Sequence, residues 1–275
     1  MNRLLKFLKP VCGFSISATM VVFTFVPESV FTYGFIQVNY SQEWIVICNR
    51  ILLFIVITLL CMLFYYAYLK LRNKEVISGN NYKIVVEFGD IFKKQGCKKV
   101  IAFDECFTTT VGQLPQDIKP DSICGQFLAS QQNINIQALI NSIGLKPLRK
   151  GSAYKGNVCY ESGSVVPCND EFLLLAFAKL DNEGNGRLTR EEFLDCLELL
   201  WKEINKYYAS QSVAIPILGS GITRMKGEPL TKQQLLDMII ASYKLYAEKI
   251  KMPAKLYIEC KRDDEFSLNK IGEYI

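Results

Sequence analysis

Residues 212–224, SVAIPILGSGITR, decide the fold. Their first part, 212–218, has the apolar composition of a buried strand, and it runs directly into the glycine-rich segment 219–221. Glycines at such a place expose backbone N–H groups and let an anionic group such as a diphosphate approach the main chain closely. An ordinary turn explains the same three residues, so the motif alone leaves both interpretations open.

On either side of this motif, short β-rich stretches alternate with amphipathic helical patterns. Strands are predicted at 83–88, 99–103, 164–167, 171–180, 212–218 and 255–260. Helices are predicted at 135–143, 191–208, 232–250 and 267–274. The alternation predicts an α/β fold, a mixed sheet flanked by helices, in which the loops at the strand ends form a ligand crevice.

Two of the predicted strands end in acidic residues. In Phe88-Gly-Asp-Ile-Phe92, the Asp90 carboxylate can accept a hydrogen bond from an adenine amino group or cap the next turn. The stretch 101–107, IAFDECF, ends in a similar way, and SICGQF follows at 122–127. The plain interpretation of the stretches 101–107 and 122–127 is a strand followed by a surface loop.

Composition excludes several function classes. The chain has 275 residues and no histidine, which excludes Ser-His-Asp machinery and His-ligated zinc. Its net charge is +5, but seven of the 32 Lys+Arg and only three of the 27 Asp+Glu precede residue 80, which leaves 25 against 24 beyond it. That balance does not support a nucleic-acid binder. The cysteines of this region form no CxxC pair and predict free thiols rather than a disulfide framework.

The first 71 residues predict a transmembrane hairpin with spans at about 5–26 and 48–69. The second span includes nineteen successive uncharged residues, 51–69, close to the roughly 20 needed to cross about 30 Å of hydrocarbon. A cleaved signal peptide is the alternative for the first span, although no small-x-small cleavage site follows it.

Basic residues lie at the start of the chain, before the uncharged part of the first predicted span, and again after the second span, whereas the connection between the spans has no cation over 27–43. The positive-inside rule therefore predicts a two-pass membrane protein with both termini in the cytoplasm. A linker at 72–81 and a cytoplasmic domain at 82–275 complete the predicted organisation.

The segment 181–192, DNEGNGRLTREE, resembles a calcium-binding EF-hand loop. Its first, fifth, sixth and twelfth positions, Asp181, Asn185, Gly186 and Glu192, match the pattern, but Glu183 occupies the third position. A strand, a polar turn and a capped helix explain the same residues without calcium. The preceding apolar stretch favours this second interpretation, and no metal site is predicted.

Taken together, GDI at 89–91, AFDECF at 102–107, SICGQF at 122–127 and PILGSGITR at 216–224 resemble the macro domain of the membrane-anchored effector family of bacterial Thoeris anti-phage systems. In that family the domain follows two transmembrane helices. Macro domains bind ADP-ribose, and the resemblance implies that the ligand lies in a crevice at the strand ends.

The resemblance also implies a role for each motif. Asp90 and Ile91 would recognise adenine. The residues that would hold the diphosphate or flank its loop are Leu218, Gly219, Ser220, Gly221, Ile222, Thr223 and Arg224. Asp104, Glu105 and Phe107 would lie near the distal ribose. The residues that would face them from the opposite loop are Ser122, Cys124, Gly125 and Gln126.

Two departures from the family pattern bear on activity. Asp104 stands where the family usually has Asn, and the glycine-rich catalytic loop of ADP-ribose hydrolases is absent. The resemblance therefore implies a ligand-sensing effector without catalytic residues or a cofactor. Its signal would be an ADP-ribose derivative, such as histidine-ADP-ribose made by a partner TIR-domain enzyme, and binding would drive homo-oligomerisation and membrane disruption. The alternatives are a membrane-tethered ADP-ribosyl hydrolase that uses Asp104 or Glu105, and a calcium-binding anchor.

Overall fold

The computed structural model describes residues 2–33, 41–131, 134–221, 223–263 and 266–274. The chain divides into two compact units, Met1–Arg72 and Asn73–Ile275. All ten cysteines lie in the described part and are free thiols, as predicted for the soluble region.

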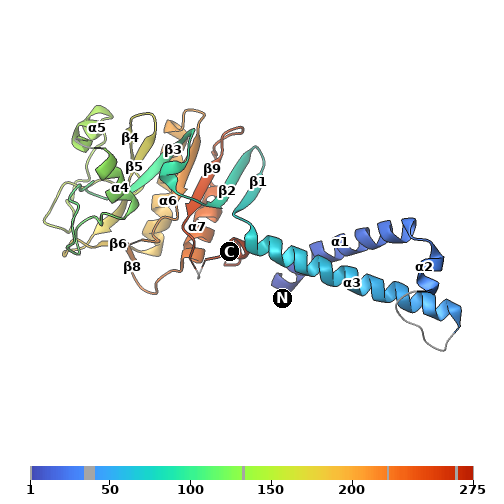
Figure 1. Cartoon of the computed structure of the whole chain (residues 1–275). Helices are drawn as coiled ribbons and strands as arrows, with labels where there is room; N and C mark the ends of the chain where they lie inside the picture. The colour runs from blue at the N-terminus through green and yellow to red at the C-terminus, as the bar shows by residue number, and fades with distance from the viewer. Residues whose placement is uncertain (1, 34–40, 132–133, 222, 264–265, 275) are drawn as a thin grey trace. The chain divides into compact units, whose positions relative to one another are not determined.

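The first unit is a helical hairpin. Helices α1 (Asn2–Phe25) and α3 (Gln42–Leu71) pack side by side, and the short helix α2 (Glu28–Thr32) lies between them in the chain (Figure 1). By length and composition, Phe7–Phe25 and Gln42–Leu71 are long and apolar enough to cross a membrane. The predicted spans largely coincide with these helices. Many of their large apolar side chains are exposed, which suits contact with lipid.

Polar contacts fasten α2 to the second helix of the hairpin. The Arg50 guanidinium lies 5.6 Å from the ring centre of Phe23 and 5.4 Å from that of Phe31, and it pairs with Glu28 at 3.4 Å. The neighbouring Asn49 is buried and donates a hydrogen bond of 2.9 Å to the carbonyl of Phe31. Arg50 is therefore neutralised by contacts within the hairpin.

The second unit is built on one mixed sheet. In the part of the chain that the structure describes, nine strands form it in the order β1-β2-β9-β7-β3-β5-β6-β8, with β4 paired to β5. The strands are β1 (Lys74–Gly79), β2 (Tyr82–Phe88), β3 (Cys97–Asp104), β4 (Val165–Cys168), β5 (Phe172–Leu180), β6 (Gly186–Leu188), β7 (Ser212–Pro216), β8 (Arg224–Met225) and β9 (Leu256–Cys260). The central run β2-β9-β7-β3-β5 is parallel throughout.

Helices cover both faces of this sheet. Helices α6 (Arg190–Tyr207) and α7 (Lys232–Leu245) pack on one face, and α4 (Ile123–Ser130) and α5 (Ile136–Ser142) pack on the other. Successive strand residues supply the two cores, since Val100 belongs to the first cluster and Ile101 to the second. Both faces are thus buried, which is why the central strands are almost uniformly apolar. The α/β fold predicted from the sequence is confirmed.

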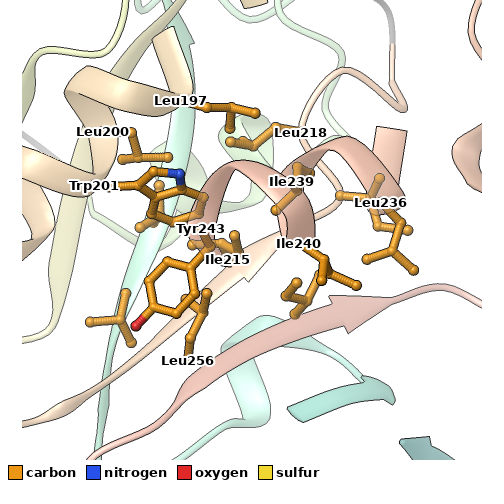
Figure 2. Close-up of a cluster of buried hydrophobic side chains, with 14 of the residues drawn as sticks. Leu197, Leu200, Trp201, Ile215, Leu218, Leu236, Ile239, Ile240, Tyr243 and Leu256 are labelled. Carbon is orange, nitrogen blue, oxygen red and sulfur yellow. The ribbon is translucent and has the colours of Figure 1, made fainter. Parts of the chain in front are cut away.

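The larger core positions the loop that follows β7. Figure 2 shows Trp201 and Leu197 of α6 facing the α7 side chains Ile239 and Tyr243, with Leu218 beside them. The Trp201 and Tyr243 rings meet edge to face at 5.0 Å, and Trp201 Nε1 donates to Ser242 Oγ at 3.0 Å. Because Leu218 is buried in this cluster, the start of the glycine loop has a fixed position.

The prediction of a linker at 72–81 is wrong for most of these residues. Residues Lys74–Gly79 form β1, which pairs antiparallel with β2 from Lys74↔Glu87 to Gly79↔Tyr82. The polar composition has a simple reason: β1 is an edge strand with few buried side chains. Asn80 and Asn81, which looked like the end of a linker, form the tight turn of the hairpin, and Asn81 adopts a positive φ of 58°.

In the second unit, two helix predictions were too long and helix α4 was missed. The helix predicted at 232–250 ends at Leu245, and the backbone N–H of Ile250 instead donates to the buried Tyr243 hydroxyl at 2.9 Å. The helix predicted at 267–274 is only the 3-10 turn Leu268–Lys270. Helix α4, by contrast, begins within the segment that was interpreted as a surface loop.

Candidate functional site

The carboxyl ends of parallel strands β2, β9, β7 and β3 lie along one edge of the sheet. The segments that follow these strands therefore share that edge: GDI after β2, the glycine loop after β7, and the acidic residues at the end of β3. Ligands of open α/β sheets bind outside this edge. The topology thus brings together three motifs that are up to about 130 residues apart in the sequence.

A cavity of about 470 Å³ opens at the β2 and β9 end of this edge. Its walls come from three segments: the chain after β2, the first turn of α4, and the end of β9. The lining residues are Phe88, Gly89, Asp90, Ile91, Phe92, Ile123, Gln126, Glu259, Cys260, Lys261 and Arg262. Of the predicted site residues, Asp90, Ile91 and Gln126 are among them.

Asp90 and Ile91 have different roles in this wall. Asp90 is exposed, and its Oδ1 accepts a hydrogen bond of 3.0 Å from the backbone N–H of Phe92, so it caps the 3-10 turn Ile91–Lys93. One carboxylate oxygen can cap while the other faces a ligand, so the two interpretations of Asp90 are compatible. Ile91 is buried against Cys97 and Ala214, and it anchors the turn to the sheet.

Glu259 is a cavity residue that the sequence analysis missed. It lies on β9 opposite Glu87 of β2, and its side chain is only 4% exposed. Its Oε1 lies 3.5 Å from Lys94 Nζ, an ammonium group that also pairs with Glu87 and sits 3.6 Å from the ring centre of Tyr257. Burial raises the pKa of the Glu259 carboxyl, Lys94 opposes that shift, and the Asp90 carboxylate adds to it.

A signal for Glu259 existed in the sequence. The stretch KLYIEC was predicted as a strand, and an acidic residue next to the end of an apolar strand matches the pattern of the other two acidic strand ends. Period-two alternation places Glu259 on the same face as Tyr257. Only the strand order shows that this end adjoins Asp90.

The facing segment is the first turn of α4 rather than a loop. Ser122 caps the helix, since its Oγ accepts a hydrogen bond of 3.0 Å from the backbone N–H of Gly125. Gln126 reaches the cavity while its Nε2 donates to the Asp121 carbonyl at 2.8 Å. Cys124 is buried, and burial together with the Asp104 carboxylate raises its pKa, so this thiol stays protonated. Gly125 has no room for a Cβ because it touches the Lys119 carbonyl.

The glycine loop lies farther along the edge, and none of its described residues lines the cavity. Gly219 has a φ of +79°, which favours glycine, and the Ser220 hydroxyl donates to the Ile217 carbonyl at 2.6 Å. Gly221 is exposed, and a Cβ built there meets no atom within 4 Å. The main chain of this loop is therefore open to a ligand.

The remaining residues of the predicted diphosphate loop are placed differently. Leu218 is buried in the α6 and α7 core, so it anchors the loop instead of facing a ligand. Ile222 lies outside the described residues. Thr223 is half-buried, and the Arg224 backbone belongs to β8, which pairs with β6.

The acidic residues at the end of β3 have protein partners. Asp104 Oδ1 accepts hydrogen bonds from the backbone N–H groups of Cys106 (2.8 Å) and Thr108 (3.3 Å), and Oδ2 accepts one from the Thr108 hydroxyl. Glu105 is buried, and its Oε1 accepts from Ser152 Oγ at 2.5 Å and from the Leu180 N–H at 3.1 Å. These contacts give both carboxylates a structural role.

Phe107 belongs to the core and not to an open crevice. Its φ is +52°, and its buried ring packs 5.8 Å from the ring centres of both Phe103 and Tyr160. The predictions that placed the Glu105 and Phe107 side chains at the distal ribose are therefore not supported by their contacts. Sequence patterns cannot distinguish an acidic or aromatic side chain at a strand end that faces a ligand from one that turns inward.

The EF-hand interpretation of 181–192 is wrong in its local structure. The segment joins β5, β6 and α6 rather than two helices. Asp181 Oδ1 accepts from the backbone N–H groups of Glu183 (3.0 Å) and Asn185 (2.9 Å), and Oδ2 pairs with Arg187 at 2.5 Å. Glu192 completes the capping box of α6 with Thr189. The plain interpretation, a strand, a polar turn and a capped helix, is the observed one.

Within the described residues, no cluster of three or more acidic or cysteine side chains can hold a metal.

Comparison with known proteins identifies the fold and the family. The profile of the family described as "Thoeris protein ThsA, Macro domain" matches residues 84–261. A protein of Bacillus amyloliquefaciens (strain Y2) described as "Thoeris protein ThsA" is 31% identical over 240 residues, which cover 82% of this chain and 80% of the relative. The chain belongs to the Thoeris ThsA family. The predicted family and the macro-domain fold are confirmed.

The ThsA family match includes both the glycine loop and nearly the whole cavity. It begins within β2 and ends just after β9, so Arg262 alone of the cavity residues lies beyond it. Solved structures of similar fold include the Oceanobacillus iheyensis macrodomain with ADP (11% identity, TM-score 0.45, covering 73% of this chain and 93% of that chain) and the same macrodomain with MES bound (12%, 0.44, 70% and 90%). Family membership makes this chain a Thoeris antiviral defence protein with a macro domain.

Proposed function

We propose that this ThsA-family chain is a membrane-anchored effector whose macro domain binds an ADP-ribose-derived signal, such as histidine-ADP-ribose, produced by a partner TIR-domain enzyme. Binding drives association of several copies and disrupts the cell inner membrane. The observation that carries the proposal is the cavity beside Asp90, at the same sheet edge as the open glycine loop of a ThsA macro domain.

The order of the strands supports an extended ligand. From β2 to β3 the edge crosses β9 and β7, which is three strand spacings or roughly 14 Å. The cavity at β2 and β9 accepts a base, the glycine loop after β7 accepts a diphosphate, and the β3 end receives the distal group. An ADP-ribose derivative has these three parts in this order.

The proposal is that the site senses its ligand rather than hydrolyses it. Asp104 and Glu105 are the two carboxylates that a hydrolase would use to activate water. Each already accepts at least two hydrogen bonds from the protein. A carboxylate held in this way is a poor general base, because its lone pairs are engaged.

Coupling to the membrane requires a difference in affinity between two states. A ligand that binds the associated form about 150-fold more tightly than the separate form shifts their ratio by the same factor, which is roughly 3 kcal/mol. The hairpin α1–α3, with both chain termini in the cytoplasm, is the part that would repack between copies. The apolar side chains exposed along both helices supply the surface for this contact.

Isothermal titration of the full chain in detergent micelles tests ligand binding. We expect heat with ADP-ribose or its histidine conjugate, and no release of product from either over the same period. A dye-filled liposome that carries the chain should leak only after the ligand is added. The absence of heat with both ligands at high concentration contradicts the proposal.

A further inference from the structure

Glu259 occupies the inner wall of the cavity, next to the end of β2. Its carboxylate lies over Gly89, whose missing Cβ leaves the space that the carboxylate fills. The side chain reaches the cavity although it is only 4% exposed. It is therefore an acidic group that a ligand in the cavity meets in a nearly water-free setting.

The hydrogen-bonding capacity of this carboxylate is not used up by the protein. Within the described part of the chain, Glu259 Oε1 accepts no hydrogen bond. The ammonium of Lys94 lies 3.5 Å away and also serves Glu87, so one cation is shared between two carboxylates. A buried acceptor without a hydrogen-bond donor destabilises the folded chain, and an N–H donor from a ligand removes that penalty.

The charges around the inner wall select the part of the ligand that binds there. Asp90 adds a second carboxylate to this side of the cavity, and a phosphate would be repelled by the pair. Of the basic lining residues, the Arg262 guanidinium sits on the Phe88 ring at 4.8 Å and donates to Asn73, and Lys261 is exposed. Phe88, Ile91 and Ile123 supply apolar walls for a flat ring.

We infer that Glu259 is a specificity-determining residue, whose carboxylate accepts a hydrogen bond from the exocyclic amino group of a purine base and so selects adenine over hypoxanthine. The inference rests on the proposed function, because it names a contact for the base of the same ligand. A carboxylate cannot donate to the carbonyl oxygen that replaces the amino group in hypoxanthine, so the wrong base would leave two acceptors facing each other.

Competition between ADP-ribose and inosine diphosphate ribose for the full chain in detergent tests this contact. We expect the unaltered chain to prefer ADP-ribose, and Glu259→Gln to lower that preference by about 10-fold to 100-fold, because the Gln amide can donate to the hypoxanthine carbonyl. Glu87→Gln is the matched control: it removes the other partner of Lys94 but does not line the cavity, and it should keep the preference.

Gly89→Ala provides a second route if Glu259→Gln does not fold. The added Cβ collides with the Glu259 carboxylate and displaces it, so this variant should also lose preference. An unaltered chain that binds both nucleotides equally, or a folded Glu259→Gln that keeps the preference, overturns the inference while the proposed function stands. An unaltered chain that binds neither nucleotide overturns the inference, and it overturns the proposed function as well when the histidine conjugate also gives no heat.

Discussion

Two pairs of acidic residues lie at different places along one sheet edge, and they differ in what their carboxylates contact. At the β2 and β9 end, Asp90 is exposed and Glu259 borders a cavity. At the β3 end, Asp104 and Glu105 accept hydrogen bonds from the backbone and from hydroxyl groups of the protein. The first pair has acceptor capacity for a ligand, whereas the second holds the fold together. An acidic strand end is therefore available to a ligand only when nearby segments leave part of its acceptor capacity unused.

Removal of the Glu105 carboxylate should have the largest effect, and it should act on stability. Glu105→Ala leaves the Leu180 N–H and the Ser152 hydroxyl buried without an acceptor, so we expect the free energy of unfolding to fall by about 3 kcal/mol. Urea unfolding followed by Trp201 fluorescence, in a Trp44→Phe background, measures this change. Ser152→Ala, which removes one donor, should cost about 1 kcal/mol. Equal stability of Glu105→Ala and the unaltered chain would contradict the structural role.

Asp90→Ala should act mainly on ligand binding. It removes an acceptor from the cavity wall, and we expect the affinity for ADP-ribose to fall about 10-fold to 100-fold by titration. The loss of the cap to Phe92 should lower stability by only about 1 kcal/mol. Asp90→Asn keeps a capping oxygen and should recover that stability. A variant whose affinity is unchanged would remove Asp90 from the site.

Gly221→Ala separates the role of the glycine loop from that of the cavity. The added Cβ meets open space, so stability should change by no more than about 0.5 kcal/mol. The same methyl group stands where a diphosphate must approach the backbone, and we expect ADP-ribose affinity to fall about fivefold while the preference for adenine is kept. Unaltered affinity would show that the ligand does not pass over this loop.

The smallest expected effect is a pH dependence of stability that Glu259 introduces. Its pKa is higher in the folded chain than in the unfolded chain, because burial penalises the charged form. Folding therefore favours the protonated form, and the stability that this proton contributes is lost as the pH rises from about 4.5 through the raised folded pKa. Relative to Glu259→Gln, the unaltered chain should lose stability over this interval, by a degree or a few degrees in Tm. Parallel Tm curves for the two proteins would contradict the shift.

The sequence predicted where the strands of the site end but not which way the side chains at those ends point. Apolar runs locate strands, so the ends of β2, β3 and β7 and their motifs were found together with Asp90 and the glycine loop. Side-chain direction at a strand end depends on neighbours far away in the chain. Phe107 turns toward Tyr160, and Glu105 toward Ser152. Strand β1 was missed because an edge strand needs little apolar surface, and its composition matches that of a linker.

By itself, the sequence determined the alternation of strands and helices, the two long apolar helices, the absence of imidazole chemistry, and the motifs that identify the family. These properties depend on local composition and spacing, which the chain carries before it folds. Only the tertiary structure decided that β9 lies beside β2, which brings Glu259 next to Asp90, and that the β3 carboxylates turn to internal donors. Strand order and side-chain pairing arise from contacts between residues that are distant in the sequence. A polar group is buried only where the folded chain places a hydrogen-bond partner beside it.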